Sequence, residues 1–419
     1  MKLYNGLTQS LQDFEPQGEP ITLYVCGITP YDTTHLGHAF TYTINDILVR
    51  YLEMDGHAVR YAQNVTDIDD DILRKARELG EDWRTLGNYW TRFFIEDMQS
   101  LNVRPPDFYP RATEFIPQMI AINARLVEKG IAYVNEGNVY YAVDAWPEFG
   151  KLSHLPRAEM LPIANQRGNR PDDPHKHHPL DFVLWQAQAA DEPAWESPWG
   201  PGRPGWHIEC SAMSSTLLGN TIDIHSGGAD LMFPHHDCEI AQLEPATGEQ
   251  PFVRYWMHAA MVYHEGEKMS KSLGNLIMCR DLFKEIHPDA LRLYLASQHY
   301  RKPWSFDYQD LEQAAELAEL MRQAAAAHSS HAGREFDAAA AHHRFVAAME
   351  EDLNTPLAAA GLVEFSRELL AASAANQDIR AAQADLRRMA GVFGLLLDAP
   401  APEARVISGW QAHLKRFSD

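Results

Sequence analysis

The chain of 419 residues is acidic, with a formal net charge of −22, and 45% of its residues are hydrophobic. Its length predicts two or three domains around a large core, and its charge opposes general binding of nucleic acid over the whole surface. The first residues lack the pattern of a signal peptide, and no apolar run reaches the roughly 20 residues of a membrane helix, so we expect a cytoplasmic protein that does not enter a membrane.

The first 130 residues alternate between strand and helix patterns. Residues 21–28 (ITLYVCGI) are rich in β-branched side chains and are predicted to form a short buried strand. Residues 40–56 carry apolar side chains at three- and four-residue spacing, which predicts a helix that Gly56 ends. A second strand over 57–70 ends in polar residues, as strands do at the carboxyl edge of a parallel sheet. Helices are predicted over 70–80, 83–102 and 112–130, so this order indicates a βαβ core that opens a doubly wound α/β fold.

Proline and glycine become frequent over residues 132–205, which we expect to be an insertion between two halves of the sheet. Another strand is predicted within 220–234, a helix over 235–244, and a strand followed by a lysine-containing loop over 254–275.

The chain beyond residue 306 is rich in alanine and is predicted to be helical. Leu386, Met389, Phe393 and Leu396 fall on one predicted helical face, which favours the core of a bundle. The sequence therefore predicts an α/β domain over 1–305 and a helical bundle over 306–419.

A candidate phosphate site lies where the first strand ends. His35, Gly37 and His38 follow a short loop and enter the predicted helix. Backbone N–H groups and the helix dipole favour an anion there, glycine allows it to approach the backbone, and the imidazoles add donors. Two histidines satisfied at the surface are the alternative.

The string KMSKSLGN, residues 268–275, places Lys268 and Lys271 three residues apart in a loop of small side chains. Such a loop can close on a polyphosphate and bring two positive charges to it. A solvated basic turn is the alternative.

The two strings together resemble the paired signatures of class I aminoacyl-tRNA synthetases. The resemblance narrows to the cysteinyl-tRNA synthetase family through YVCGITPYD, NVTDIDD, LDFVLW, GRPGWHIECSAMS and DIHSGGADLMFPHHDCEIAQ, which occur in the family's order. It implies a Rossmann-like catalytic domain with a parallel sheet and an inserted region, followed by an all-α bundle.

The resemblance also implies a reaction and its participants. L-cysteine would be activated by ATP to cysteinyl-adenylate and transferred to tRNA-Cys by a monomeric ligase, with Mg²⁺ accompanying the ATP. His35 and His38 would stabilise the α-phosphate, and Lys268 and Lys271 would stabilise the departing pyrophosphate.

Zinc ligands are implied at Cys26, Cys210, His235 and Glu239. Sulfur, imidazole and carboxylate suit tetrahedral Zn²⁺, and His235 and Glu239 lie four apart, on one face of a helix. Zinc that binds a thiolate would separate cysteine from serine, whereas packing alone gives about 1–3 kcal/mol for such small differences. Cys238 is a competing fourth ligand, and core thiols at positions 26 and 210 are the alternative to a metal site.

The amino-acid pocket is implied to include Gly27, Thr29, Trp206, His225 and Asp230. His225 stands at a predicted strand end, which suits a small zwitterion, and Asp230 could meet its ammonium group. The run His175-Lys176-His177-His178 is predicted to be a solvated loop.

The sequence leaves more than one acceptor possible for the activated cysteine. Members of the family usually continue into an anticodon-reading domain, whereas few residues follow Leu397, so we expect most of that extension to be lacking. Residues 306–419 hold 10 Lys and Arg against 17 Asp and Glu, which is not a basic tRNA clamp. The mycothiol-pathway cysteine ligase is also similar, and it suggests the amine of glucosaminyl-inositol as a second acceptor. A catalytically silent paralogue that binds a partner is the third alternative.

Overall fold

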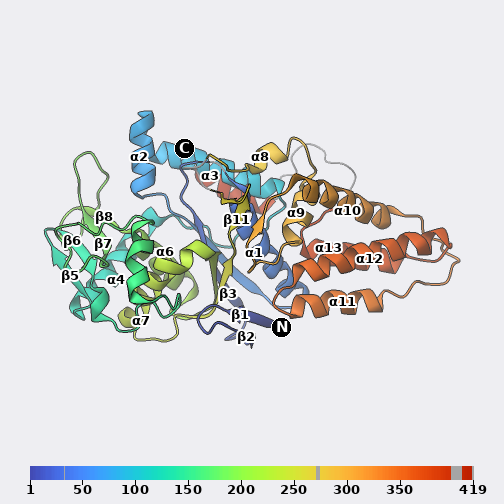
Figure 1. Cartoon of the computed structure of the whole chain (residues 1–419), viewed down its shortest axis with the longest axis horizontal. Helices are drawn as coiled ribbons and strands as arrows, with labels where there is room; N and C mark the ends of the chain where they lie inside the picture. The colour runs from blue at the N-terminus through green and yellow to red at the C-terminus, as the bar shows by residue number, and fades with distance from the viewer. Residues whose placement is uncertain (33, 270–273, 398–407, 418–419) are drawn as a thin grey trace.

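The computed structural model describes residues 1–32, 34–269, 274–397 and 408–417. It is elongated, with an antiparallel sheet at one end, a parallel sheet in the middle and a group of helices at the other end (Figure 1). Within these residues, no helix combines the length and the apolar character that crossing a membrane requires.

The central sheet has four parallel strands in the order β10-β9-β3-β4. Helix α1 (Leu36–Met54) joins β3 to β4, and α7 (Asp237–Thr247) lies between β9 and β10, so both connections are crossovers of the doubly wound type. The prediction of a parallel α/β sheet is confirmed. The strand bounds are β3 (Ile21–Ile28), β4 (Val59–Val65), β9 (Ile222–Gly228) and β10 (Val253–Ala259).

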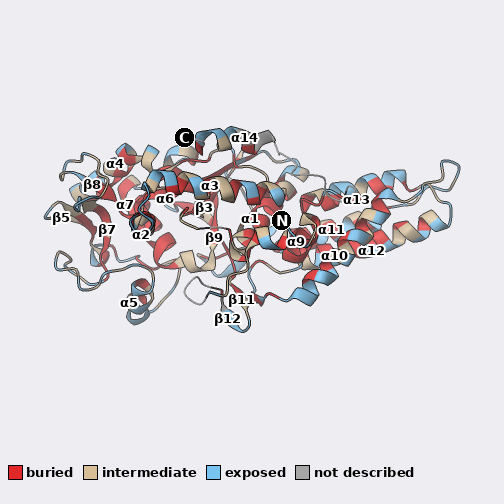
Figure 2. Cartoon of the chain, turned by 90° about the horizontal axis from the view of Figure 1, so that it is seen from above, coloured by how far each residue is buried: buried red, intermediate tan, exposed pale blue. Residues whose placement is uncertain are grey.

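The strands β3 and β9 are buried on both faces, and β3 (ITLYVCGI) accordingly has an almost continuous apolar sequence. Strand β9 (IDIHSGG) instead buries the polar side chains of Asp223, His225 and Ser226. Figure 2 shows the buried residues concentrated along the middle of the molecule. Outside β4, Phe108 and Arg111 form parallel bridges with Ala62 and Val65, so the segment 107–111 extends the sheet edge.

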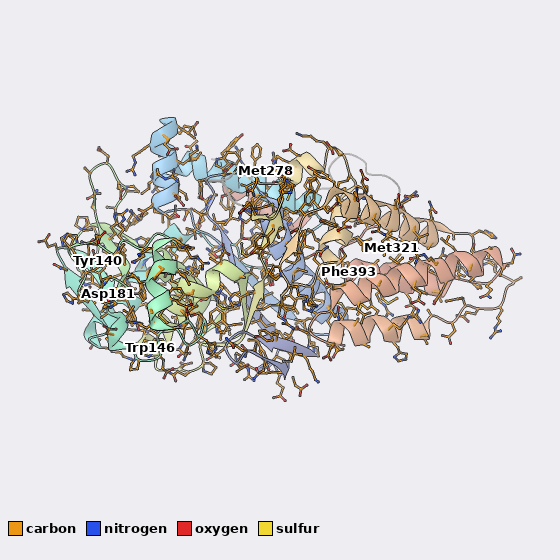
Figure 3. The ribbon with its side chains drawn as sticks, viewed as in Figure 1. Tyr140, Trp146, Asp181, Met278, Met321 and Phe393 are labelled. Atoms are coloured by element: carbon orange, nitrogen blue, oxygen red, sulfur yellow. The ribbon has the colours of Figure 1, made fainter. Side chains whose placement is uncertain are left out.

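The range predicted as an insertion contains a separate antiparallel sheet in the order β5-β6-β7-β8. Asp181, labelled in Figure 3, is 1% exposed and accepts hydrogen bonds from the Tyr133 hydroxyl and the Val143 backbone N–H at 2.8 and 3.0 Å. This buried carboxylate therefore ties the loop before β7 to the start of the sheet. The strands are β5 (Ala132–Asn135), β6 (Asn138–Tyr141), β7 (Phe182–Ala187) and β8 (Gly202–Pro204).

The remaining elements of the α/β part are short strands and the helices around the sheets. The strands are β1 (Lys2–Asn5), β2 (Ser10–Asp13), β11 (Val262–His264), β12 (Glu267–Lys268) and β13 (Trp304–Ser305). The helices are α2 (Asp70–Leu79), α3 (Trp83–Ser100), α4 (Ile116–Glu128), α5 (Arg157–Asn165), α6 (Trp206–Leu218), α8 (Cys279–Leu282) and α9 (Pro288–Ala296).

The helical end holds α10 (Tyr308–Ala326), α11 (Ala339–Glu350), α12 (Thr355–Ala374) and α13 (Arg380–Val392). Leu386, Met389 and Phe393 are fully buried, as the predicted helical face requires. Leu396 was assigned to that face wrongly, because α13 ends at Val392 and the Leu396 side chain is 37% exposed.

Helix α14 (Ser408–Leu414) lies against α3, away from the other C-terminal helices. Trp410 is fully buried there and donates from Nε1 to the Val103 carbonyl at 2.8 Å. A helix late in the chain therefore packs onto the α/β part.

A buried arginine, paired with an aspartate of the α/β part, also contacts the helical end. Arg292 of α9 contacts Asp46 of α1 at 2.5 Å and donates to the carbonyls of Leu101, at 2.7 Å, and Phe393. Gly394 has a φ of +69°, and a Cβ there would lie 2.3 Å from the Arg292 guanidinium carbon. Four segments thus meet at one guanidinium, with glycine required at the closest approach.

Candidate functional site

Four side chains from distant parts of the chain meet near the carboxyl ends of β3 and β9. Cys26 comes from β3, Cys210 from α6, His235 from the turn before α7, and Glu239 from the first turn of α7. One ligand atom from each lies within 4.8 Å of the others, and none of the four residues is more than 5% exposed. The structure thus brings together all the residues predicted as metal ligands.

The spacing of these atoms suits a tetrahedral metal ion. Two sulfurs bound to one tetrahedral Zn²⁺ at about 2.3 Å each lie about 3.8 Å apart, and the Sγ atoms of Cys26 and Cys210 are separated by 3.8 Å. The Glu239 Oε1 atom is 3.8 Å from Cys26 Sγ and 3.1 Å from His235 Nε2. The donor set and its geometry therefore fit a resident metal ion.

Burial disfavours the charged forms of three of these groups. It raises the pKa of the Cys26 thiol and of the Glu239 carboxyl, and it lowers the pKa of His235. A bound divalent cation would compensate, because it favours thiolate, carboxylate and neutral imidazole at the same time.

A second ring of histidines surrounds the four groups. His225 Nε2 lies 2.9 Å from Glu239 Oε2, and His207 Nδ1 lies 2.9 Å from His235 Nδ1. His236 Nε2 is 3.3 Å from Cys26 Sγ, and its other ring nitrogen contacts His258 at 2.8 Å. These contacts fix ring orientations around the candidate ligands, as outer-shell partners do in metal sites.

Two histidines of this outer ring form a second candidate ligand set together with Cys26 and Glu239. Cys26, His225, His236 and Glu239 also place one ligand atom each within 4.8 Å of the others. The two sets share Cys26 and Glu239, so one ion at a time can use them. His236 is not among the ligands predicted from the sequence, although the adjacent His235-His236 pair was a signal for it.

The predicted phosphate motif stands at the start of α1. His35 is the N-cap residue, and its Nδ1 accepts a hydrogen bond from the Gly37 N–H at 3.1 Å. A neutral His35 ring must then carry its proton on Nε2, which leaves that atom as a donor. The His38 ring stacks on His35 with centroids 3.8 Å apart. The Gly37 N–H thus bonds to His35, and the role predicted for Gly37, which is to let an anion approach the backbone, stays a prediction.

The segment after the lysine loop lies beside this motif. Leu36 N–H donates to the Ile277 carbonyl at 2.8 Å, and Cys279 N–H donates to the Thr34 carbonyl at 3.2 Å. Figure 3 labels the intervening Met278, which forms a backbone bridge with His35. The two signature strings are far apart in sequence, but the residues that follow the lysine loop lie next to His35 and Leu36 of the first string.

The two predicted catalytic lysines cannot be placed as side chains. The backbone of Lys268 belongs to β12 and pairs with Tyr263, while its side chain and the whole of Lys271 lie outside the described part of the chain.

The comparisons with known proteins agree with this architecture. Residues 14–316 match the family described as tRNA synthetases class I (C) catalytic domain, and residues 344–398 match the DALR domain. A cysteine–tRNA ligase of Alkalilimnicola ehrlichii is 46% identical over 405 residues, which are 96% of this chain and 86% of that protein. The chain belongs to the class I cysteine–tRNA ligase family.

Other relatives and a solved structure point the same way. A cysteine–tRNA ligase of Symbiobacterium thermophilum is 45% identical, with 96% of this chain and 89% of that protein covered. Methionyl-tRNA synthetase of Mycobacterium tuberculosis, solved with methionyl-adenylate, superposes with a TM-score of 0.64 at 16% identity over 91% of this chain and 90% of that chain. That similarity supports the class I fold.

Two of the five residues predicted to line the amino-acid pocket contact candidate metal ligands directly. Trp206 stacks on the His235 ring at 4.4 Å, and His225 contacts Glu239. Gly27 follows Cys26 and donates from its N–H to Asn64 Oδ1 at 2.7 Å. The half-buried Thr29 directly follows β3, and Asp230 follows β9, where its backbone carbonyl accepts a hydrogen bond from Arg167.

Two other predictions concern residues outside the candidate centre. Cys238 is buried in an apolar cluster and belongs to neither candidate ligand set of the described residues. The run His175-Lys176-His177-His178 lies in a loop and likewise contributes to neither set.

Proposed function

We propose that this chain activates L-cysteine with ATP and transfers it to tRNA-Cys. The observation that carries the proposal is the buried cluster of Cys26, Cys210, His235 and Glu239 in a chain 46% identical to a cysteine–tRNA ligase over most of its length. A soft donor set at the carboxyl end of a parallel sheet lies where such folds bind ligands.

In this proposal the four residues hold Zn²⁺, and Cys238 does not. When bound, the zinc would favour the thiolate form of the substrate cysteine and so distinguish it from serine. His225 and Trp206 hold the ligands Glu239 and His235 in place. Gly27, Thr29 and Asp230 complete the amino-acid pocket, where Asp230 meets the ammonium group of the substrate.

The ATP would bind with Mg²⁺ beside the start of α1. His35 Nε2–H and His38 donate to the α-phosphate while the cysteine carboxylate attacks it, and Gly37 keeps the His35 ring in position. Lys268 and Lys271 meet the departing pyrophosphate. Leu36 and Ile277 support this pairing of motifs, since their backbone contact keeps the flank of the lysine loop near His35.

We further propose that residues 1–305 form the catalytic domain, with a connective insertion at about 132–205, and that 306–419 form the helical domain. Relatives of which this chain covers 86–89% are cysteine–tRNA ligases, which favours tRNA-Cys over an aminosugar as the acceptor. We propose a monomer in the cytoplasm.

The deciding experiment separates activation from transfer. Purified protein with zinc should support cysteine-dependent ATP–pyrophosphate exchange and should charge tRNA-Cys, while glucosaminyl-inositol should stay unmodified. Exchange with acylation of the sugar amine and no charged tRNA would exclude the proposed acceptor. A protein without exchange, whose zinc content and folding are normal, would exclude the activity.

A further inference from the structure

The two thiols of the candidate metal centre are already in contact. Cys26 Sγ and Cys210 Sγ lie 3.8 Å apart, and this is the only contact between two cysteine sulfurs within the described part of the chain, which includes all four cysteines. The other two thiols are buried elsewhere, Cys238 in α7 and Cys279 in α8. One pair of the four cysteines is thus placed for a covalent bond.

A disulfide needs the sulfurs to approach from 3.8 Å to about 2.0 Å. The two residues come from elements that pack directly on each other, β3 and α6. The approach therefore starts from two side chains on neighbouring elements of the folded protein. A shared metal ion would hold the sulfurs at their present separation and occupy the lone pairs that attack a disulfide.

We propose that Cys26 and Cys210 form a disulfide modification site that metal loss opens and that a small disulfide molecule oxidises. The Cys26 sulfur attacks one sulfur of R–S–S–R, which forms a mixed disulfide and releases one RSH. The Cys210 sulfur then attacks the Cys26 sulfur and releases the second RSH. Both cysteine protons leave on the two released thiols, so atoms and electrons balance.

The oxidant reaches the site through the amino-acid pocket. This step rests on the proposed function, because a pocket that leads a cysteine thiol to the metal also admits one half of cystine, the disulfide of the same amino acid. Oxidised glutathione carries the same bond on a bulkier molecule. The disulfide would remove two sulfur ligands at once, so the oxidised protein cannot take zinc back until it is reduced.

The test maps thiols on the full-length protein. Protein stripped with a chelator, and zinc-loaded protein, are each treated with cystine, alkylated under denaturing conditions and digested for mass spectrometry. We expect a Cys26–Cys210 crosslink in the stripped sample, with Cys238 and Cys279 alkylated, and at least about tenfold slower crosslinking with zinc bound. Four alkylated cysteines, or a crosslink that uses Cys238 or Cys279, would overturn the proposal.

Variants and a second oxidant sharpen the result. Cys210→Ser should stop at a mixed disulfide on Cys26, detected as the added mass of one cysteine, whereas Cys238→Ala and Cys279→Ala should crosslink as the unaltered chain does. Should Cys210→Ser fail to fold, mapping of the unaltered chain decides alone. Equal rates with cystine and oxidised glutathione would overturn entry through the pocket.

The proposed function and this inference fail separately. A protein that forms the crosslink but supports no cysteine-dependent pyrophosphate exchange would refute the function and leave the modification site standing. Reduction with dithiothreitol followed by zinc should restore the zinc content of the oxidised protein, a readout that does not depend on catalysis.

Discussion

Replacing Gly37 with alanine tests the role of the motif at the start of α1. A Cβ at this position would lie 3.0 Å from Cε1 and 3.1 Å from Nδ1 of His35. The ring must move by a few tenths of an ångström or more and loses the 3.1 Å hydrogen bond from the residue 37 N–H. Because misplacing a catalytic group by about 1 Å can cost about 10²-fold, and losing a preorganised donor costs at least as much, we expect kcat/KM for cysteine-dependent ATP–pyrophosphate exchange to fall about 10²-fold.

The stability of the same variant should change little. Loss of the N-cap bond costs about 0.5–2 kcal/mol, and alanine in place of glycine inside a helix returns up to about 1 kcal/mol. Gly361→Ala in α12 is the matched control, since nothing lies within 4 Å of its Cβ position. That control should gain about 0.5–1 kcal/mol in urea unfolding and keep full activity. A folded Gly37→Ala protein with unchanged kcat/KM would refute the role given to His35.

Four further variants test other parts of the structure. Gly27→Ala would place a Cβ 1.5 Å from the Asn64 carbonyl oxygen, so β3 and β4 would have to move apart. We expect the free energy of unfolding, measured in urea, to fall by more than about 4 kcal/mol, or no folded protein to form. A variant of unchanged stability would contradict this strand pairing. Cys210→Ser should lower zinc content, measured by metal analysis, together with cysteine activation, and full activity without zinc would contradict the metal site. Burial raises the pKa of Asp69, the N-cap of α2, to about 7. The folded state therefore keeps a proton between about pH 4 and 7 that the unfolded state has released, and the free energy of unfolding falls as pH rises through this window. Asp69→Asn, which keeps a capping side chain, should flatten that pH dependence in urea titrations, and an unchanged slope would contradict the assignment. Trp410→Ala should cost about 3–5 kcal/mol, because the ring is fully buried against the α/β part, and a loss below about 1 kcal/mol would show that α14 does not dock there.

The strands and helices of the α/β part could be predicted because their sequences carry clear periodicity. Residues 21–28 became β3 without change, and Gly80 ends α2 in a left-handed conformation, as a C-cap glycine should. The position of Leu396 was predicted wrongly because helical spacing continues in the sequence past Val392, where α13 ends. Spacing cannot reveal that the chain turns at Gly394 to meet Arg292.

In the candidate site, too, some residues could be predicted from the sequence and others could not. Cys26, Cys210, His235 and Glu239 were found through residue chemistry and family resemblance, and the fold brings them together. His236 escaped because adjacent histidines look equivalent in a sequence. Its contact with Cys26 depends on the backbone conformation of the turn before α7, which the positions of the two histidines in the sequence do not reveal.

The buried Arg292–Asp46 pair limits how this protein can be divided or recombined. The Arg292 guanidinium binds backbone carbonyls on both sides of the boundary between the sheet-containing and helical parts. A cut near residue 305 would leave Arg292 paired with Asp46 but would remove the Phe393 carbonyl, so one buried N–H of the guanidinium would lose its acceptor. A chimaera that takes its C-terminal helices from a relative must also carry a turn equivalent to Phe393–Gly394, placed so that its carbonyl accepts the hydrogen bond from Arg292. Otherwise the helices will not pack correctly on the α/β part.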